Sequence, residues 1–531
     1  MCFSLNRKML SGSFWLSFGS IFSRALGVVY LIPWLYMMGS AHNITTAQAL
    51  NNSSYTIYAI FLSLGTAGFP SGIARRVAMY NGQGKFKNSQ KLFRTGFWLM
   101  VISGLAFAVL LYFLAPFFAK NTPVVSQHDS TLAIRSLVPA VAVLPSMSII
   151  RGWFQGNQDL QPFGISQLWE QIFRIIFILA STYLLIYQFH ISYVVAVYYS
   201  VFAAFVGALA SYIYLIHHYY KQIPLYRAEE SKSHALDLHG IKHILFMIAY
   251  ESVPFVIVGA GITLCQIIDQ LFFKQIMQSM LHKSAEYTQY IYTIFSANPS
   301  KITAVIIALA TALAETSLPL IAAKNAIHDH VSIKKLLEQN LPFLLFVLFP
   351  AATMLGVLSP EINGIFFTYD SNGALFLYVN IWQSVIMAIA INGLTLLQSL
   401  HYSRKAMTYL LLGLITKIVC QLPLVYYFQG MGAVMATAVA FSVVCLLSYH
   451  KIHEQFGFSL RHLIPIIIVN VVYFVFITLL TLLARQVYLP AGKVSGFIFC
   501  GIIGVIALLI YILLANKLGL SERLFGRDIG K

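Results

Sequence analysis

Long apolar runs separated by short polar segments cover nearly the whole chain. Fourteen runs reach about 20 residues or more, the length that an α-helix needs to cross a bilayer. They cover approximately residues 13–38, 52–75, 95–119, 131–151, 162–188, 193–219, 244–281, 298–323, 340–360, 374–400, 405–428, 431–450, 462–486 and 494–516. The pattern predicts an all-α polytopic membrane protein with about 14 transmembrane helices.

A weak internal repeat divides these runs into two sets. The segments FQGNQDLQPFGISQLWEQIFRI and LQSLHYSRKAMTYLLLGLITKI align at an offset of 243 residues, which pairs Arg174 with Lys417. The offset advances the chain by six helices, an even number, so the two halves have the same orientation. We therefore expect two parallel pseudo-symmetric six-helix lobes and two C-terminal helices. The predicted parts are 1–220, a cytoplasmic linker 221–243, the second lobe 244–455, and the last two helices with a tail, 456–531.

Composition and charge agree with a membrane protein. The chain of 531 residues is 59% hydrophobic, and only 10% of it is charged, against roughly 25% in soluble domains. No polar segment exceeds about 25 residues, so the net charge of +17 has no soluble domain on which to form a nucleic-acid-binding face. With the N-terminus inside, the predicted cytoplasmic segments hold 24 Lys and Arg and the external loops only 4. This distribution predicts that both termini are cytoplasmic.

The sequence contains no motif for a cofactor or a metal. The five cysteines have no CxxC spacing, and four of them lie in apolar segments, which indicates neither a disulfide framework nor a zinc site. A Walker A sequence is absent, which argues against direct coupling to ATP. The alternatives are that transport is coupled to the membrane potential, to sodium or to protons.

Several charged residues fall inside the apolar runs, where they usually face water or one another. Three cations lie near mid-helix, together with three acidic residues and a fourth nearer the cytoplasmic end of its helix. They are Arg24, Arg174 and Lys417, then Glu170, Asp269 and Glu315, and last Glu251. An arginine at mid-depth costs about 2.5–3.5 kcal/mol on insertion scales, so a polar partner is expected.

Each of these charges has two interpretations. Arg24 has no acidic residue in its own helix, so it either lines a cavity and contacts substrate or pairs with Glu170, Asp269 or Glu315. Glu170 and Arg174 are spaced i,i+4 and form either a self-neutralising pair or part of a substrate site. Lys417, at the position of Arg174 in the repeat, serves substrate binding, gating or packing.

Two acidic residues and a pair of arginines at the end of the second run also have two possible roles each. Asp269 and Glu315 suit a coupling ion or proton, or else pairing with Lys274 or another cation. Arg75 and Arg76 are expected to close the second helix at its cytoplasmic end. They are either positive-inside anchors or collectors of phosphate groups.

Three stretches resemble a known family. FSRALG (22–27), GFPSGIARRVAMYNGQGK (68–85) and RGWFQGNQDLQPFGISQLWEQIFRI (151–175) are similar to the Gram-positive branch of the MurJ-type lipid II flippases. That branch is grouped with the stage V sporulation protein B family and the polysaccharide biosynthesis transporters of the MOP superfamily. The resemblance implies that Arg24 contacts a pyrophosphate in a central cavity. The arginine pair that Gram-negative members have early in the second helix is absent here, as is an acidic residue soon after FSRALG.

The resemblance also implies a function. It implies export of lipid II, an undecaprenyl-pyrophosphate-linked peptidoglycan precursor, across the bacterial cytoplasmic membrane by alternating access. The implied partners are this glycan lipid and membrane lipids, with the protein acting as a monomer near cell-wall synthases. Alternatives are a flippase for another undecaprenyl-linked glycan or a cation-coupled multidrug exporter, although exporters of cations prefer acidic residues to a central arginine. An enzyme is disfavoured because the outer loops are short and lack clustered Asp, Glu, His or Arg.

Overall fold

The described part of the chain divides into two compact units. The computed structural model describes residues 15, 19, 22–23, 26–66, 69–233, 250, 252–326, 328–457, 463–490 and 492–520, without every side chain. The units are Met1–Thr263 and Leu264–Lys531. Among the predicted site residues, Arg24, Glu251 and the side chain of Glu315 lie outside the described residues.

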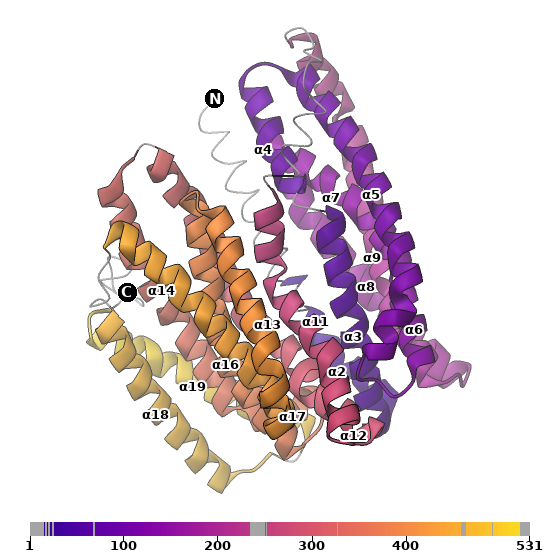
Figure 1. Ribbon diagram of the computed structural model, residues 1–531, viewed down its shortest axis with the longest axis vertical. Helices are drawn as coiled ribbons and strands as arrows, with labels where there is room; N and C mark the ends of the chain where they lie inside the picture. The colour runs from indigo at the N-terminus through magenta and orange to yellow at the C-terminus, as the bar shows by residue number, and fades with distance from the viewer. Residues whose placement is uncertain are drawn as a thin grey trace. The chain divides into compact units, whose positions relative to one another are not determined.

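Both units consist of helices (Figure 1). The first unit contains α2 (Leu31–Met38), α3 (Ala41–Thr66), α4 (Phe69–Gly82), α5 (Phe86–Asn121), α6 (Gln127–Arg135), α7 (Val138–Gly156), α8 (Gln161–Tyr183) and α9 (Tyr193–Ser231). α11 (Gly261–Lys274) crosses the boundary, and the second unit continues with α12 (Ala285–Tyr292), α13 (Asn298–Ala326), α14 (His330–Val357), α15 (Ser359–Phe366), α16 (Ser371–Ser399), α17 (Ser403–Phe456), α18 (Ile464–Val487) and α19 (Lys493–Lys517).

The helices confirm a polytopic membrane protein. Within the described residues, 10 helices are long and apolar enough to span a bilayer, or up to 11 if the bent pair Ser252–Gly259 and Gly261–Met280 is one span. The 54-residue α17 consists of two helices joined at Gln429, whose backbone is non-helical. The break lies between the predicted spans 405–428 and 431–450. The layout of fourteen spans stays a prediction.

The second apolar run was predicted at 52–75, and the structure corrects this boundary. α3 begins at Ala41, and α4 covers Phe69–Gly82, past both arginines. Arg75 and Arg76 therefore lie inside α4 and do not close the second helix. Hydropathy misplaced the start because α3 buries polar side chains, among them Gln48 and Asn51, inside the unit.

α9 extends to Ser231, past the end of the predicted run 193–219 and into the predicted linker 221–243. Tyr226, within this extension, packs its ring against Trp153 at 5.5 Å and Phe86 at 6.0 Å between centroids. Trp153 is fully buried. Aromatic packing thus holds a polar, charged stretch in helical form, which the hydropathy pattern did not indicate.

Left-handed turn residues recur at nearly constant spacing in the two units. Residues with positive φ often lie at the end of a helix, and residues other than glycine rarely adopt this conformation. The pairs 39/282 and 158/401 are 243 positions apart and the pair 84/328 is 244 apart: Gly39 and His282, Gln158 and His401, Gly84 and His328. The spacing matches the offset of the sequence repeat, so positive-φ residues recur at corresponding positions of the two units.

α18 is attached to α15 by a buried ion pair. Arg485, in the last turn of α18, donates from Nε and Nη2 to the two carboxylate oxygens of Glu361, each at 2.7 Å. It also donates to the carbonyl oxygen of Val357 at 2.8 Å. Glu361 is 2% exposed, so its charge depends on this partner.

Replacing Arg485 with methionine is expected to destabilise the protein by about 3 kcal/mol, because Glu361 keeps a buried charge without its partner. The melting temperature of the detergent-solubilised protein measures the effect. Lys517→Met, at the exposed end of α19, is the control and should leave the melting temperature unchanged. Equal stability of Arg485→Met and wild type would contradict this prediction.

Candidate functional site

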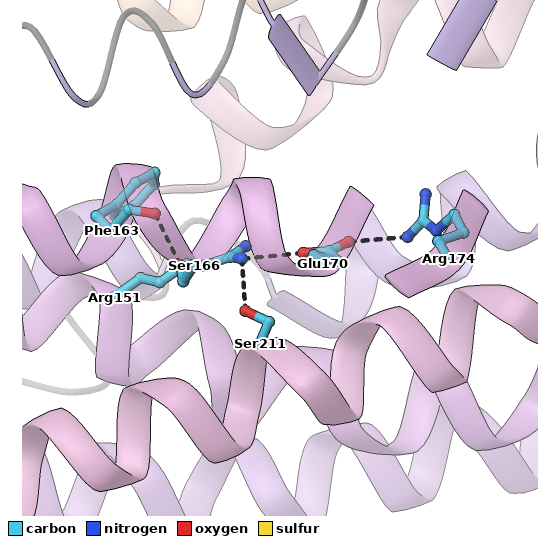
Figure 2. Close-up of polar contacts among 6 residues, drawn as sticks. All are labelled: Arg151, Phe163, Ser166, Glu170, Arg174 and Ser211. Carbon is cyan, nitrogen blue, oxygen red and sulfur yellow. Dashed lines mark hydrogen bonds and ion pairs between the residues drawn. The ribbon is translucent and has the colours of Figure 1, made fainter. Parts of the chain in front are cut away.

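The first unit contains a buried cluster of two arginines and one glutamate, which we call the arginine cluster: Arg151, Glu170 and Arg174 (Figure 2). α7 supplies Arg151, and α8 presents Ser166, Glu170 and Arg174 at intervals of four residues, which places them along one face. The helix begins at Gln161, with Pro162 in its first turn, directly after the left-handed turn residue Gln158.

Glu170 is shared between the two arginines. Arg151 Nη2 donates to Glu170 Oε2 at 2.9 Å, and Arg174 Nη2 donates to Glu170 Oε1 at 2.8 Å. Arg151 is further held by Ser166 Oγ at 2.9 Å and by Ser211 Oγ on α9 at 3.0 Å. The predicted i,i+4 pair therefore forms, but it does not neutralise itself, because Arg151 uses the same carboxylate.

The arginine cluster carries one unbalanced positive charge. Two guanidinium groups share one carboxylate, and the three side chains are only 12%, 17% and 20% exposed. The Nε of Arg174 is buried and has no hydrogen-bond partner among the described residues. A buried guanidinium with an unused donor is prepared to bind an additional acceptor, and phosphate oxygens match its geometry.

Polar groups from the N-terminal helices surround Arg174. The phenol groups of Tyr30, Tyr55 and Tyr58 lie close enough to interact with its charge. On α3, both amide atoms of Gln48 and the Nδ2 of Asn51 are buried without a hydrogen-bond partner in the described part of the chain. The surroundings of Arg174 are thus rich in polar groups.

Gly19 and Gly27 lie close to α8, the helix that carries Glu170 and Arg174. A Cβ added to Gly19 would lie 2.5 Å from the carbonyl oxygen of Gly164 on α8. One added to Gly27 would lie 3.3 Å from Nε2 of Gln171, next to Glu170. Glycines thus allow close approach to α8 on both sides of position 24 in the sequence.

Gly207 allows α9 to approach α8 at the cluster. A Cβ at this position would overlap the carbonyl oxygen of Glu170 and would lie 3.1 Å from the Cβ of Arg174. The backbone oxygen belongs to a helix and cannot rotate away as a flexible side chain would. The spacing of the two helices is therefore set by this glycine.

Gly207→Ala is expected to destabilise the protein by about 1–3 kcal/mol, because α8 and α9 must separate to admit the methyl group. The melting temperature reports this change. Gly501→Ala on α19 is a matched control, since a Cβ there meets nothing within 4 Å. A Gly207→Ala variant that melts no lower than Gly501→Ala would show that the helices tolerate the added atom.

In the second unit, the structure brings Lys417 and Asp269 together. Lys417 Nζ donates to Asp269 Oδ1 at 2.6 Å, and the lysine side chain is fully buried. Of the two pairings predicted for Asp269, the one with a cation other than Lys274 is the one that forms. Although Arg174 and Lys417 align in the repeat, their partners differ in location. Arg174 pairs with Glu170 in its own helix, whereas Lys417 pairs with Asp269 on α11.

Arg75 and Arg76 do not contact the arginine cluster in the described contacts. Arg75 is exposed on α4, whereas Arg76 is partly buried and its Nε has no hydrogen-bond partner among the described residues. Among those residues, no three His, Cys, Asp or Glu side chains come together as a metal site requires.

Sequence reasoning missed the other side chains that contact these charges. They are Arg151, Ser166 and Ser211 in the arginine cluster, and Thr437 and Gln421, which form hydrogen bonds with Lys417 and Asp269 respectively. Arg151 was assigned to a cytoplasmic segment, although RGWFQG continues the apolar pattern through Trp153 and Phe154 and so indicated a longer helix. Gln421 follows Lys417 by four residues and was detectable from helical spacing. Ser211 and Thr437 gave no signal, because small hydroxyl residues are common in transmembrane helices.

Comparison with known proteins assigns the family. The model for the family "Polysaccharide biosynthesis protein" matches residues 9–324. Lipid II flippase MurJ of Bacillus subtilis (strain 168) is 28% identical to the chain, covering 99% of it and 98% of the relative. Stage V sporulation protein B of the same organism is 25% identical over 34% of this chain and 35% of its own length.

Solved structures share the fold. A lipid II flippase MurJ in an inward closed conformation superposes with a TM-score of 0.67 and 13% identity, covering 96% of this chain and 99% of that chain. An inward-facing multidrug resistance MATE family transporter of the MOP superfamily gives 0.63 and 11% identity, with coverage of 81% and 98%. The chain is therefore a member of the polysaccharide biosynthesis protein family, a multi-pass membrane transporter and not an enzyme.

Proposed function

We propose that the chain is a flippase that exports lipid II, the undecaprenyl-pyrophosphate-linked peptidoglycan precursor, from the inner to the outer leaflet of the bacterial cytoplasmic membrane. The flippase of Bacillus subtilis that it resembles matches over nearly the full length of both chains. Transport proceeds by alternating access of two six-helix lobes, with two further C-terminal helices and with both termini in the cytoplasm. The recurrence of left-handed turns at the repeat offset supports the two-lobe arrangement.

The unbalanced positive charge of the arginine cluster carries this proposal. A pyrophosphate headgroup cannot cross hydrocarbon alone, because leaving water without new hydrogen bonds costs many kcal/mol. Charge-assisted hydrogen bonds from guanidinium groups replace that water. A net cationic cluster inside the spanning region suits an anion, whereas a drug exporter for cations requires the opposite sign.

Arg174 is the residue of the cluster assigned to the headgroup, because its Nε is unused while Arg151 is held by two serines and Glu170. Arg24 is assigned to the same anion, as the resemblance of FSRALG to the flippase family implies. Arg75 and Arg76 attract the headgroup before it enters.

The acidic residues and Lys417 take supporting roles in this mechanism. Glu170 is the counter-charge that keeps the arginine cluster assembled when no substrate is bound. Lys417 and Asp269 neutralise each other in the second unit, and Glu315 and Glu251 remain candidates for counter-charges. A membrane potential that is negative on the cytoplasmic side favours outward movement of the anion and inward return of the empty cationic site. The gain is about 2.3 kcal/mol per charge for 100 mV.

A flippase for another undecaprenyl-linked glycan, such as an exopolysaccharide or teichoic repeat unit, is the second candidate. The family description, polysaccharide biosynthesis, favours it. Such substrates carry the same kind of lipid phosphate, so the arginine cluster suits both.

The protein works as a monomer beside the synthases that consume its product.

Depletion complementation tests the proposal. The chain is expressed in cells whose own lipid II flippase is depleted, and growth and the export of labelled lipid II are followed. Restoration of both is expected. A correctly inserted protein that restores neither would contradict lipid II transport and favour the second glycan, which is then tested in a strain lacking that flippase.

A further inference from the structure

The ammonium group of Lys417 lies in a cage of three oxygens supplied by two helical segments. The acceptors are Asp269 Oδ1 on α11 at 2.6 Å, Thr437 Oγ1 at 2.6 Å and the carbonyl oxygen of Ala433 at 2.9 Å. Lys417 precedes the break of α17 at Gln429, whereas Ala433 and Thr437 follow it. We call these three acceptors the oxygen cage.

Every proton of the ammonium has an acceptor, and the cage is arranged for a cation. The hydroxyl of Thr437 gives its own proton to Ala433 O at 3.1 Å, which leaves its oxygen to face Lys417. Gln421 Nε2 holds Asp269 Oδ1 in place at 2.9 Å. The Oε1 of Gln421 is buried and has no hydrogen-bond partner among the described residues, so a further oxygen is available beside the cage.

The donor set is that of a hard metal cation. Carboxylate, hydroxyl and carbonyl oxygens are the ligands that hard cations take in proteins. In transporters, coupling ions are commonly bound beside broken helices. Here the break at Gln429 lies four residues before Ala433. Asp269 supplies one negative charge, which balances one monovalent cation.

We infer that Lys417 is a tethered cation that permanently occupies a monovalent-cation site, so that Asp269 exchanges no metal ion with the solution. Removing the ammonium opens the oxygen cage to sodium or a similar alkali cation. The inference concerns ion binding in the second unit, so it holds whichever headgroup is transported. It narrows the coupling alternatives, because sodium is excluded from Asp269 while Lys417 is present.

Thermal melting of the purified full-length protein in NaCl, LiCl or choline chloride, at equal ionic strength, tests this inference. Wild type is expected to melt at the same temperature in all three salts. Lys417→Ala is expected to melt several degrees lower than wild type in choline chloride. Sodium or lithium should raise its melting temperature saturably, because a bound cation stabilises the folded state. Adding Asp269→Asn should abolish that rise.

Lys405→Ala, an exposed lysine on the same helix, is the matched control and should show no cation-specific shift. A saturable rise of wild type in sodium that Asp269→Asn removes would overturn the inference, as would folded Lys417→Ala without a cation-specific rise. If Lys417→Ala is not recovered in choline chloride, it is purified in NaCl throughout. Recovery in NaCl supports the inference, and failure in both salts overturns it.

Discussion

Replacing Glu170 with glutamine is expected to destabilise the protein by about 3–5 kcal/mol, the usual effect of breaking a buried ion pair. Glutamine keeps the size of the side chain but removes the charge that Arg151 and Arg174 share. Two positive charges would then face each other across a neutral amide in a region with little water. The melting temperature of the purified protein, or the fraction recovered folded, measures the effect.

Glu454→Gln is the control, because Glu454 pairs with Lys451 at the surface and its side chain is 58% exposed. Its effect should be small, as is usual for exposed pairs. The double variant Glu170→Gln with Arg174→Met removes one of the two facing charges and should recover part of the lost stability. Full stability of Glu170→Gln alone would contradict the shared-carboxylate arrangement.

Arg174→Met is expected to reduce export of the lipid-linked substrate by about ten- to hundredfold, the loss that corresponds to removing one hydrogen bond to a charged group. The fold should tolerate this change, because Arg151 and Glu170 remain as a neutral pair held by Ser166 and Ser211. Arg174→Met is thus expected to lower transport without lowering stability, whereas Glu170→Gln lowers stability. Export is measured in the depletion strain at matched amounts of inserted protein.

Arg174→Lys refines this prediction. Lysine keeps the positive charge but lacks the planar fork of donors, so an intermediate rate is expected. Lys405→Met serves as the control for removing a cation from the protein elsewhere. Wild-type export by Arg174→Met would remove Arg174 from substrate binding and leave Arg24 as the candidate.

Hydropathy predicted several helices within a few residues, but failed where polar side chains are buried or charged ones are packed. The predicted run 162–188 corresponds closely to α8 together with the π-helical turn Leu184–Gln188 that follows it, and the runs 374–400 and 462–486 correspond to α16 and α18. The start of α3 and the end of α9 were missed. Buried amides lower the hydropathy of α3, whereas aromatic packing around Trp153 holds the end of α9.

The sequence by itself determined the helical membrane architecture, the presence of charges inside the spans and the i,i+4 relation of Glu170 to Arg174. These depend on chain-local properties, because apolar length and helical spacing act within one segment. Only the tertiary structure decided that Arg151 joins that pair and that Asp269 belongs to Lys417. Partners on different helices are chosen by how those helices pack. Close contacts of glycines, such as that of Gly207 with α8, determine how these helices pack. No periodic pattern in the sequence predicts these contacts.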